Sequence, residues 1–219
     1  MSKIPTGFEA HLFSPIRHVR LTVPSNCSKA GALLFVGSVQ FGTFLMLAEA
    51  VSPGYSLQLN YISDLGSTFP ASAPIFNSSI VLFGALVLGS AYYLQRAFGW
   101  LPLSGLIAFS GIGLLGVGLF PEGSSFALHD LFSFLTFLFS GLAAVVAARF
   151  QRAPLSCFSV ILGSTTLAAM ILYVPGTGSF GTMIGIGVGG LERMIVYPVL
   201  FWSIGFSGHL IGMEDRAST

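Results

Sequence analysis

The sequence predicts an all-α, polytopic membrane helix bundle with six transmembrane helices. Hydrophobic residues make up 53% of the 219 residues and charged residues only 8%, whereas a soluble domain carries about 25% charged residues. So few charges cannot cover a water-facing surface, and the apolar excess is therefore expected to face lipid. The apolar runs are continuous and lack the alternation that a barrel strand needs, which favours helices.

Six apolar stretches are long enough to cross a membrane, because a helix needs about 20 apolar residues to span the hydrocarbon core. We expect the spans at residues 29–51, 75–94, 101–120, 128–148, 157–174 and 191–213. Proline and glycine fall between the runs, as is typical of helix boundaries. The predicted organisation is a cytosolic N-terminal arm (1–28), a six-helix domain (29–213) and a cytosolic tail (214–219).

The positive charges predict the orientation of the bundle. With the N-terminus in the cytosol, eight of the nine Lys and Arg residues fall on the cytosolic side, and Arg193 alone lies outside. This positive-inside bias predicts a multi-pass protein of the cell membrane with both termini in the cytoplasm. Cys27 and Cys157 then lie on the reducing side, so no disulfide is expected. A net charge of +1 without a basic cluster argues against a nucleic-acid partner and leaves membrane lipids as the expected one.

The remaining charged residues gather at the predicted outer end of the bundle, where ionisable groups are usually paired or functional. Together with nearby polar residues they define a candidate outer polar pocket: Glu49, Asn60, Asp64, Glu122, His129, Asp130, Glu192, Arg193 and Tyr197. Within it, Asp64, His129, Glu192 and Arg193 are expected to converge. Because Glu192 points elsewhere on the helix, we expect Arg193 to pair with Asp64, Glu122 or Asp130 from another segment.

Two patterns predict how the helices pack. In the fourth span, polar residues recur at i, i+4, i+7 and i+11 and form one stripe that should face the bundle interior: His129, Ser133, Thr136 and Ser140. The third span is rich in glycine, and small residues let membrane helices approach closely. We therefore expect the third span to be central. Its glycines are Gly105, Gly111, Gly113, Gly116 and Gly118.

Residues 176–181 read Gly-Thr-Gly-Ser-Phe-Gly, which matches the dinucleotide-binding pattern literally. That site needs a strand before the motif, a helix after it and an acidic residue about 20 positions on. Here a membrane span precedes the motif, and Glu192 comes too early. We interpret the segment as a flexible outer loop or a short helix whose glycines pack on a neighbour.

Three interpretations of the outer pocket remain open. It is a structural cap, a binding site for a lipid headgroup or polar ligand with Arg193 as the anion contact, or a metal or acid–base site. In the last case His129 is ligand or general base, with Asp64, Glu122 or Glu49 as the carboxylate. The candidate metal ligands are His129 and Asp64. A carboxylate-rich site would suit Mg, Ca or Mn. The sequence does not identify a cofactor.

The leading functional interpretation is therefore a membrane protein whose outward-facing pocket binds a ligand, lipid or partner, or has a structural role. The alternative is an enzyme that acts on a lipid or lipid-linked substrate at the outer leaflet. A transporter is less favoured, because most spans are nearly free of ionisable groups at mid-depth and the two halves show no obvious internal repeat.

Several segments resemble a known family, domain of unknown function 998 (DUF998). They are residues 60–66 (N-Y-I-S-D-L-G), Phe120-Pro121 followed by His129, and residues 190–193 (G-L-E-R) with Tyr197-Pro198 and Trp202. The resemblance covers most of the chain beyond the N-terminal arm. It implies a multi-pass membrane architecture and a bacterial or archaeal cell membrane, and it implies no activity.

Overall fold

The computed structural model describes residues 25–124, 127–173 and 179–213, so most of the predicted arm and the tail lie outside the described residues. Six of the described helices are long and apolar enough to cross a membrane. They are α1 (Asn26–Ala50), α2 (Ala73–Phe98), α3 (Leu101–Leu119), α4 (Leu128–Ala147), α5 (Leu155–Leu172) and α7 (Gly187–Gly212). The predicted all-α fold with six spans is confirmed.

The local sequence explains where most helices begin and end. Ser25 caps α1, because its side chain accepts a hydrogen bond from the Ser28 N–H at 3.2 Å. A proline occupies the first turn of α2, and this helix ends at Gly99, whose φ of 64° is left-handed. The last span differs from the prediction, since α7 begins at Gly187 rather than at residue 191. Glu192 therefore lies in the second turn of a helix, not at its opening.

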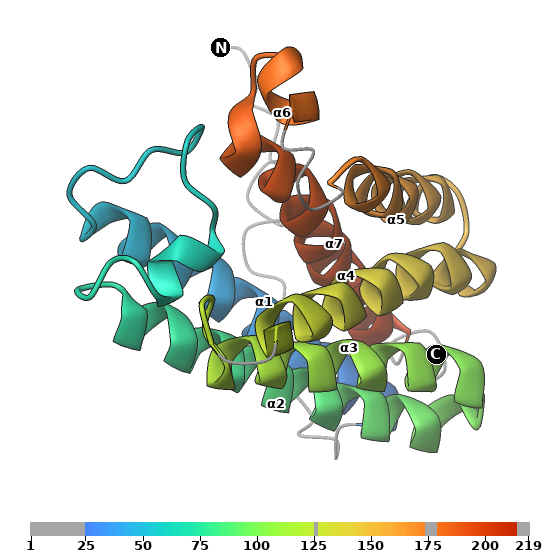
Figure 1. Cartoon of the computed structure of the whole chain (residues 1–219). Coiled ribbons are helices and arrows are strands. Elements are labelled where there is room, and N and C mark those ends of the chain that lie inside the picture. Colours follow the sequence, from blue (N-terminus) through green and yellow to red (C-terminus); the bar gives the residue numbers. More distant parts are fainter. Residues whose placement is uncertain (1–24, 125–126, 174–178, 214–219) are drawn as a thin grey trace, which may run out of the picture.

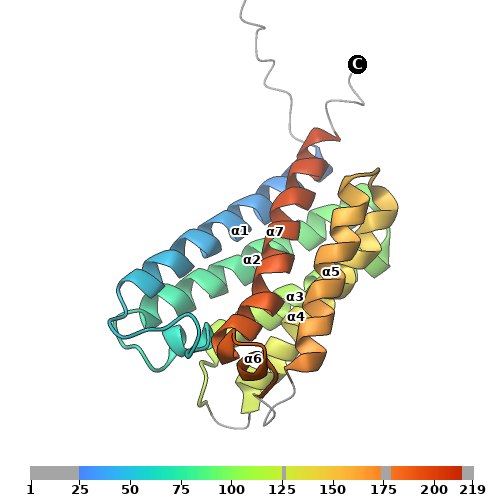
Figure 2. The same cartoon turned by 90° about the horizontal axis from the view of Figure 1, so that it is seen from above.

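The six spans form a ring in which each helix packs against the next along the chain, and α7 closes the ring between α5 and α1. Figures 1 and 2 show this order, with α1 and α2 on one side and α4 and α5 on the other. Short elements lie at one end: the 3-10 helix η1 (Ser63–Gly66) in the α1–α2 connection, and α6 (Ser179–Met183) beside the start of α7. We call this the loop end, formed by residues 51–72, 120–124 and 179–186.

Glycine lets α3 approach both of its neighbours, as its composition predicts. A Cβ at Gly113 would overlap Thr136 of α4, and one at Gly116 would overlap the ring of Phe132. On the other side a Cβ at Gly118 would meet Ile80 of α2 at 2.6 Å. With α7, α3 is the most buried of the spans, at 56% of its apolar window. Gly105 is different, because nothing lies within 4 Å of the position of its Cβ.

Hydrogen bonds between helices satisfy polar groups inside the bundle, where water is scarce. Ser38 of α1 and Ser203 of α7 share a hydrogen bond of 2.6 Å, and Ser90 of α2 donates to the carbonyl of Ala30 at 2.8 Å. Thr166 of α5 donates to the carbonyl of Ile195 on α7 at 2.9 Å. The bond between Ser38 and Ser203 joins the first and the last span of the bundle.

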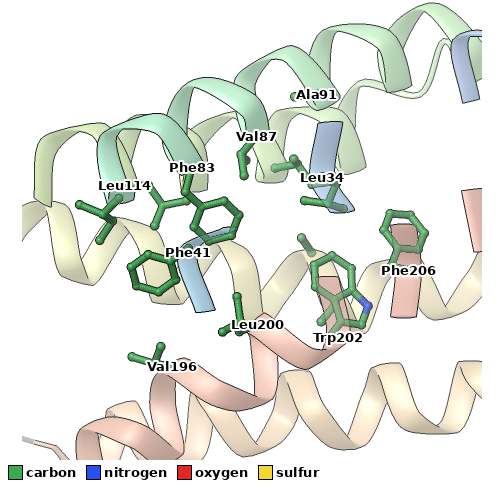
Figure 3. Packing of buried hydrophobic residues seen from close by; sticks show 14 of the residues in the cluster. Leu34, Phe41, Phe83, Val87, Ala91, Leu114, Val196, Leu200, Trp202 and Phe206 are labelled. Atoms are coloured by element: carbon green, nitrogen blue, oxygen red, sulfur yellow. The ribbon is translucent and has the colours of Figure 1, made fainter. Parts of the chain in front are cut away.

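The buried hydrophobic core lies between α1, α2, α3 and α7. Figure 3 shows Phe41 and Phe83 stacked from α1 and α2, opposite Leu200 and Trp202 of α7. Large apolar side chains also cover the outside of the spans and are well exposed, as expected for helices in contact with lipid. Examples are Phe35, Met46, Leu82, Phe109, Phe134, Ile161 and Phe201.

A cavity with one polar end

A cavity of about 80 Å³ runs inside the bundle, between α1, α2, α3, α4 and α7. Its walls are mainly apolar and include Phe41, Phe83, Leu114, Val199 and Leu200. A single water molecule occupies about 10–15 Å³ when cavities are measured in this way. The space is therefore larger than an ordinary packing gap, and its chemistry suits an apolar group.

The polar stripe of α4 faces this cavity. His129, Ser133, Thr136 and Ser140 all contribute to the lining, so the predicted inward orientation of the stripe is confirmed. Phe134 points the other way and is 50% exposed. The close contact of α3 with α4 at Gly113 and Gly116, described above, holds this stripe against the bundle interior.

Three polar residues line the cavity where it reaches the loop end: Ser63, His129 and Glu192. Glu192 accepts a hydrogen bond from the backbone N–H of Ile62. The Ser63 hydroxyl donates to Glu122 at 2.6 Å, which brings a second carboxylate to this end. We call Ser63, Glu122, His129 and Glu192 the polar end of the cavity.

The tautomer of His129 follows from its hydrogen bond. The side chain is buried, and its Nδ1 lies 3.0 Å from the carbonyl oxygen of Phe120. Because a carbonyl oxygen can only accept, Nδ1 carries a hydrogen. In the neutral imidazole the other nitrogen, Nε2, is then a hydrogen-bond acceptor.

Arg193 forms a separate cluster that does not belong to the cavity lining. Its guanidinium pairs with Glu49 of α1 at 2.8 Å and donates to the Tyr55 hydroxyl at 2.6 Å. It also donates to three backbone carbonyls, those of Leu57 at 2.9 Å, Gly189 at 3.0 Å and Asn60 at 3.4 Å. The cluster therefore ties the α1–α2 connection and the end of α1 to the start of α7.

The prediction that Arg193 pairs with Asp64, Glu122 or Asp130 was wrong, because the ion-pair partner is Glu49. Asp64 accepts instead from the N–H of Tyr61 at 2.9 Å and from the Asn60 amide at 3.2 Å. Its carboxylate is thus engaged by backbone and side chain within its own loop. Glu122 is engaged by Ser63, as described above.

The other predicted pocket residues divide among these features. Tyr197 lies one turn beyond Arg193 and faces the Arg193–Glu49 pair. Asn60 builds the loop, since its side-chain oxygen accepts from the Ser56 N–H at 3.0 Å. Asp130 is exposed in the first turn of α4. The nine residues of the candidate outer pocket are therefore distributed over two clusters, one loop and one exposed position.

Glycine allows the α1–α2 connection to approach α7. The N–H of Gly189 donates to the carbonyl of Gln58 at 3.1 Å, and a Cβ at Gly189 would overlap the carbonyl oxygen of Asn60. The glycine-rich segment also turns between α6 and α7 at Gly185, whose φ is 82°. The segment thus contains a short helix, α6, and glycines that pack on a neighbouring loop.

Two tyrosines outside the spans are held as neutral phenols. Burial raises the pKa of Tyr55 to about 12, although the adjacent Arg193 acts in the opposite direction. Burial also raises the pKa of Tyr173, and the nearby charge of Glu192 adds to the effect. The Tyr55 hydroxyl can therefore accept from Arg193 and donate to the carbonyl of Tyr61 at 3.0 Å.

Metal binding at His129 and Asp64 finds no support in the geometry. Across residues 25–124, 127–173 and 179–213, no three His, Cys, Asp or Glu side chains are grouped so that they could hold a metal ion. The two cysteines, Cys27 and Cys157, are not joined by a disulfide.

Of the predicted site residues only His129 and Glu192 line the cavity, and Ser63 and Trp202 are among the lining residues that were missed. Ser63 lines the polar end, and Trp202 lines the cavity in its inner part, ten residues beyond Glu192. The indole N–H of Trp202 has no hydrogen-bond partner among the described residues. The sequence does indicate the α7 side of the cavity. Four lining residues recur there at i, i+4, i+7 and i+11 and so share one face of the helix: Glu192, Val196, Val199 and Ser203.

The fold and the cavity together define a class: a multi-pass helical membrane protein whose bundle encloses an apolar cavity with one polar end. The model of a protein family, "Protein of unknown function (DUF998)", matches residues 35–209. The chain belongs to this family. No curated protein and no solved structure matches the chain.

Proposed function

We propose that this protein binds an amphiphilic, lipid-like molecule inside its helix bundle. The observation that carries the proposal is the cavity itself, whose walls are mainly apolar and whose ionisable lining residues, His129 and Glu192, lie together at one end. Ligand sites are concave and mainly apolar, with a few convergent polar groups that fix orientation. In the proposed complex, a hydrocarbon chain lies among Leu114, Val199 and Leu200, and the head group lies at the polar end.

The Arg193 cluster has a structural role in this proposal. A guanidinium carries five N–H donors. The two terminal nitrogens of Arg193 contact a carboxylate, a phenol and three carbonyls, and its Nε–H is the one donor of this side chain without a partner among the described residues. It is therefore poorly placed to act as an anion contact for a ligand. We infer that Arg193 holds the α1–α2 connection over the bundle, so that Ile62 and Ser63 cover the polar end.

The loop end lies outside the cell in this proposal, and both termini are cytoplasmic. Eight of the nine Lys and Arg residues support this orientation. The polar end would then face the outer leaflet, and the ligand's head group would lie near the outer membrane surface.

Filling the cavity tests the proposal. Val199 lines the cavity on α7 and Ala143 lines it on α4, so Val199→Phe and Ala143→Leu should each reduce binding. Val160→Phe is the matched control, because Val160 of α5 is 43% exposed on the outside of the bundle. Native mass spectrometry would measure retention of palmityl alcohol by the detergent-purified protein. Retention by both cavity variants at the level of the wild type would contradict the proposal.

An enzymatic role is the second candidate, because His129 and Glu192 line the same end of one cavity. An imidazole and a carboxylate are the usual groups of general acid–base catalysis. The test is to incubate the reconstituted protein with a total extract of polar membrane lipids and to follow product masses. A product that the wild type forms and the Glu192→Gln variant does not would favour the enzyme, and an unchanged lipid profile favours the binding protein.

A further inference from the structure

We propose that the head group of the bound amphiphile is a hydrogen-bond donor, an amine or a hydroxyl, and not an anion such as a phosphate. This inference rests on the proposed function, because it names the ligand class for the same cavity. Three observations about the described residues support it.

Hydrogen-bond acceptors outnumber free donors at the polar end. Glu192 and Glu122 each bring a carboxylate, and a carboxylate has about four lone-pair sites. Ile62 and Ser63 supply backbone N–H groups to Glu192, and Ser63 has already given its hydroxyl hydrogen to Glu122. The polar end therefore has acceptor capacity that its own residues leave unused.

His129 adds another acceptor in its neutral form. Its Nδ1–H is engaged by the carbonyl of Phe120, which leaves Nε2 with a lone pair. A head group with N–H or O–H bonds could donate to this nitrogen as well as to Glu192. A phosphate dianion brings only further acceptors and would donate to neither His129 Nε2 nor Glu192.

The cation next to Glu192 in the sequence is directed to other partners. Successive residues on a helix point about 100° apart, and Arg193 uses that difference to reach Glu49 and Tyr55. Lys29 and Arg96, which are among the other described cations, lie at the opposite end of the bundle near Tyr93 and Tyr92. A ligand cation or donor would therefore meet the Glu192 side chain without a protein cation between them, whereas an anion would find no cation among the lining residues.

Trp202 lies in the wall of the cavity and can report whether the cavity is occupied. Its side chain is only 5% exposed, lines the cavity, and has an N–H without a partner among the described residues. Figure 3 shows the ring extending from α7 toward the side of the bundle where α2 lies.

Trp202 also makes the inference measurable. The chain has two tryptophans, so Trp100→Phe leaves Trp202 as the single fluorophore and keeps an aromatic ring against Phe150. Palmityl amine, palmityl alcohol and palmityl phosphate, each brominated on the chain, would be titrated in detergent at neutral pH. Bromine quenches a tryptophan only at close range, so quenching of this buried ring reports entry into the cavity.

We expect the amine and the alcohol to quench Trp202 at concentrations at least about tenfold lower than the phosphate. Glu192→Gln should remove most of this preference while keeping an acceptor for the Ile62 N–H. Asp130→Asn is the matched control, because it makes the same change in charge at an exposed carboxylate of the loop end, and it should leave the preference unchanged.

The outcomes separate the two proposals. Equal quenching by all three compounds, or tightest binding of the phosphate, would refute the head-group inference and leave binding in the cavity intact. A preference for donors that survives in Glu192→Gln would also refute it. If none of the compounds quenches Trp202, the proposed function itself fails.

Discussion

Replacing Arg193 by alanine removes the contacts that hold the α1–α2 connection on α7. The variant leaves Glu49 without its ion-pair partner. It also removes the hydrogen bonds that the Tyr55 hydroxyl and the carbonyls of Leu57 and Gly189 accept from Arg193. The side chains of Arg193 and Glu49 are only 10% and 20% exposed, so water replaces these contacts incompletely.

The size of the effect follows from this burial. Removing one member of a buried ion pair costs about 3–5 kcal/mol, because the remaining charge is uncompensated. Glu49 retains some access to solvent, so we expect a loss near the lower limit, about 3 kcal/mol. The assay is the free energy of unfolding in detergent micelles as the fraction of a denaturing detergent is raised.

Two further variants make the result interpretable. Arg96→Ala removes the same charge at an exposed site over Tyr92, and it should cost at most about 1 kcal/mol. Glu49→Gln in the Arg193→Ala background should recover part of the loss, because it removes the unpaired charge. If Arg193→Ala is no more destabilising than Arg96→Ala, the cluster does not act as a tether and the reasoning is refuted.

Three further results are expected. Gly116→Ala should destabilise the bundle by about 1–3 kcal/mol, because its Cβ would overlap the facing ring on α4. Gly105→Ala lies in open space on the same helix and should stabilise the bundle by up to about 1 kcal/mol. Equal effects of the two variants in a thermal unfolding assay would contradict the packing of α3 on α4. Burial raises the pKa of Tyr55 to about 12, so folding favours the protonated phenol. The contribution of this phenol to the free energy of unfolding is complete below about pH 10, the pKa of a tyrosine in the unfolded chain. It is lost as the pH rises through about 12. The difference between the ultraviolet titration curves of the wild type and the Tyr55→Phe variant reports the ionisation of Tyr55. An ionisation near pH 10 in this difference would contradict the burial of Tyr55. An impermeant thiol reagent applied to intact cells should label Ser67→Cys, at the loop end, and spare the exposed native Cys157 at the opposite end; the reverse pattern would overturn the proposed orientation.

The sequence alone determined the spans and the inward face of α4. Hydropathy and helical spacing are local properties, and in lipid a long apolar run has no good alternative to a helix. The spacing of His129, Ser133, Thr136 and Ser140 therefore identified a lining of the cavity. The start of α7 was misplaced, because Gly187 to Gly190 read as a loop and the structure shows them as the first turn of the helix. The end of α2 was misplaced by as much, since the helix continues to Phe98 beyond the predicted residue 94.

Only the tertiary structure decided which charges meet. Asp64, His129, Glu192 and Arg193 were expected to converge at one end of the bundle, but Asp64 is engaged by its own loop. Glu192 and Arg193 are neighbours in the sequence, yet one lines the cavity and the other reaches Glu49. A helix directs consecutive side chains about 100° apart. Which element faces each side chain therefore depends on how the helices and the α1–α2 connection pack, and the spacing of residues in the sequence does not determine that packing.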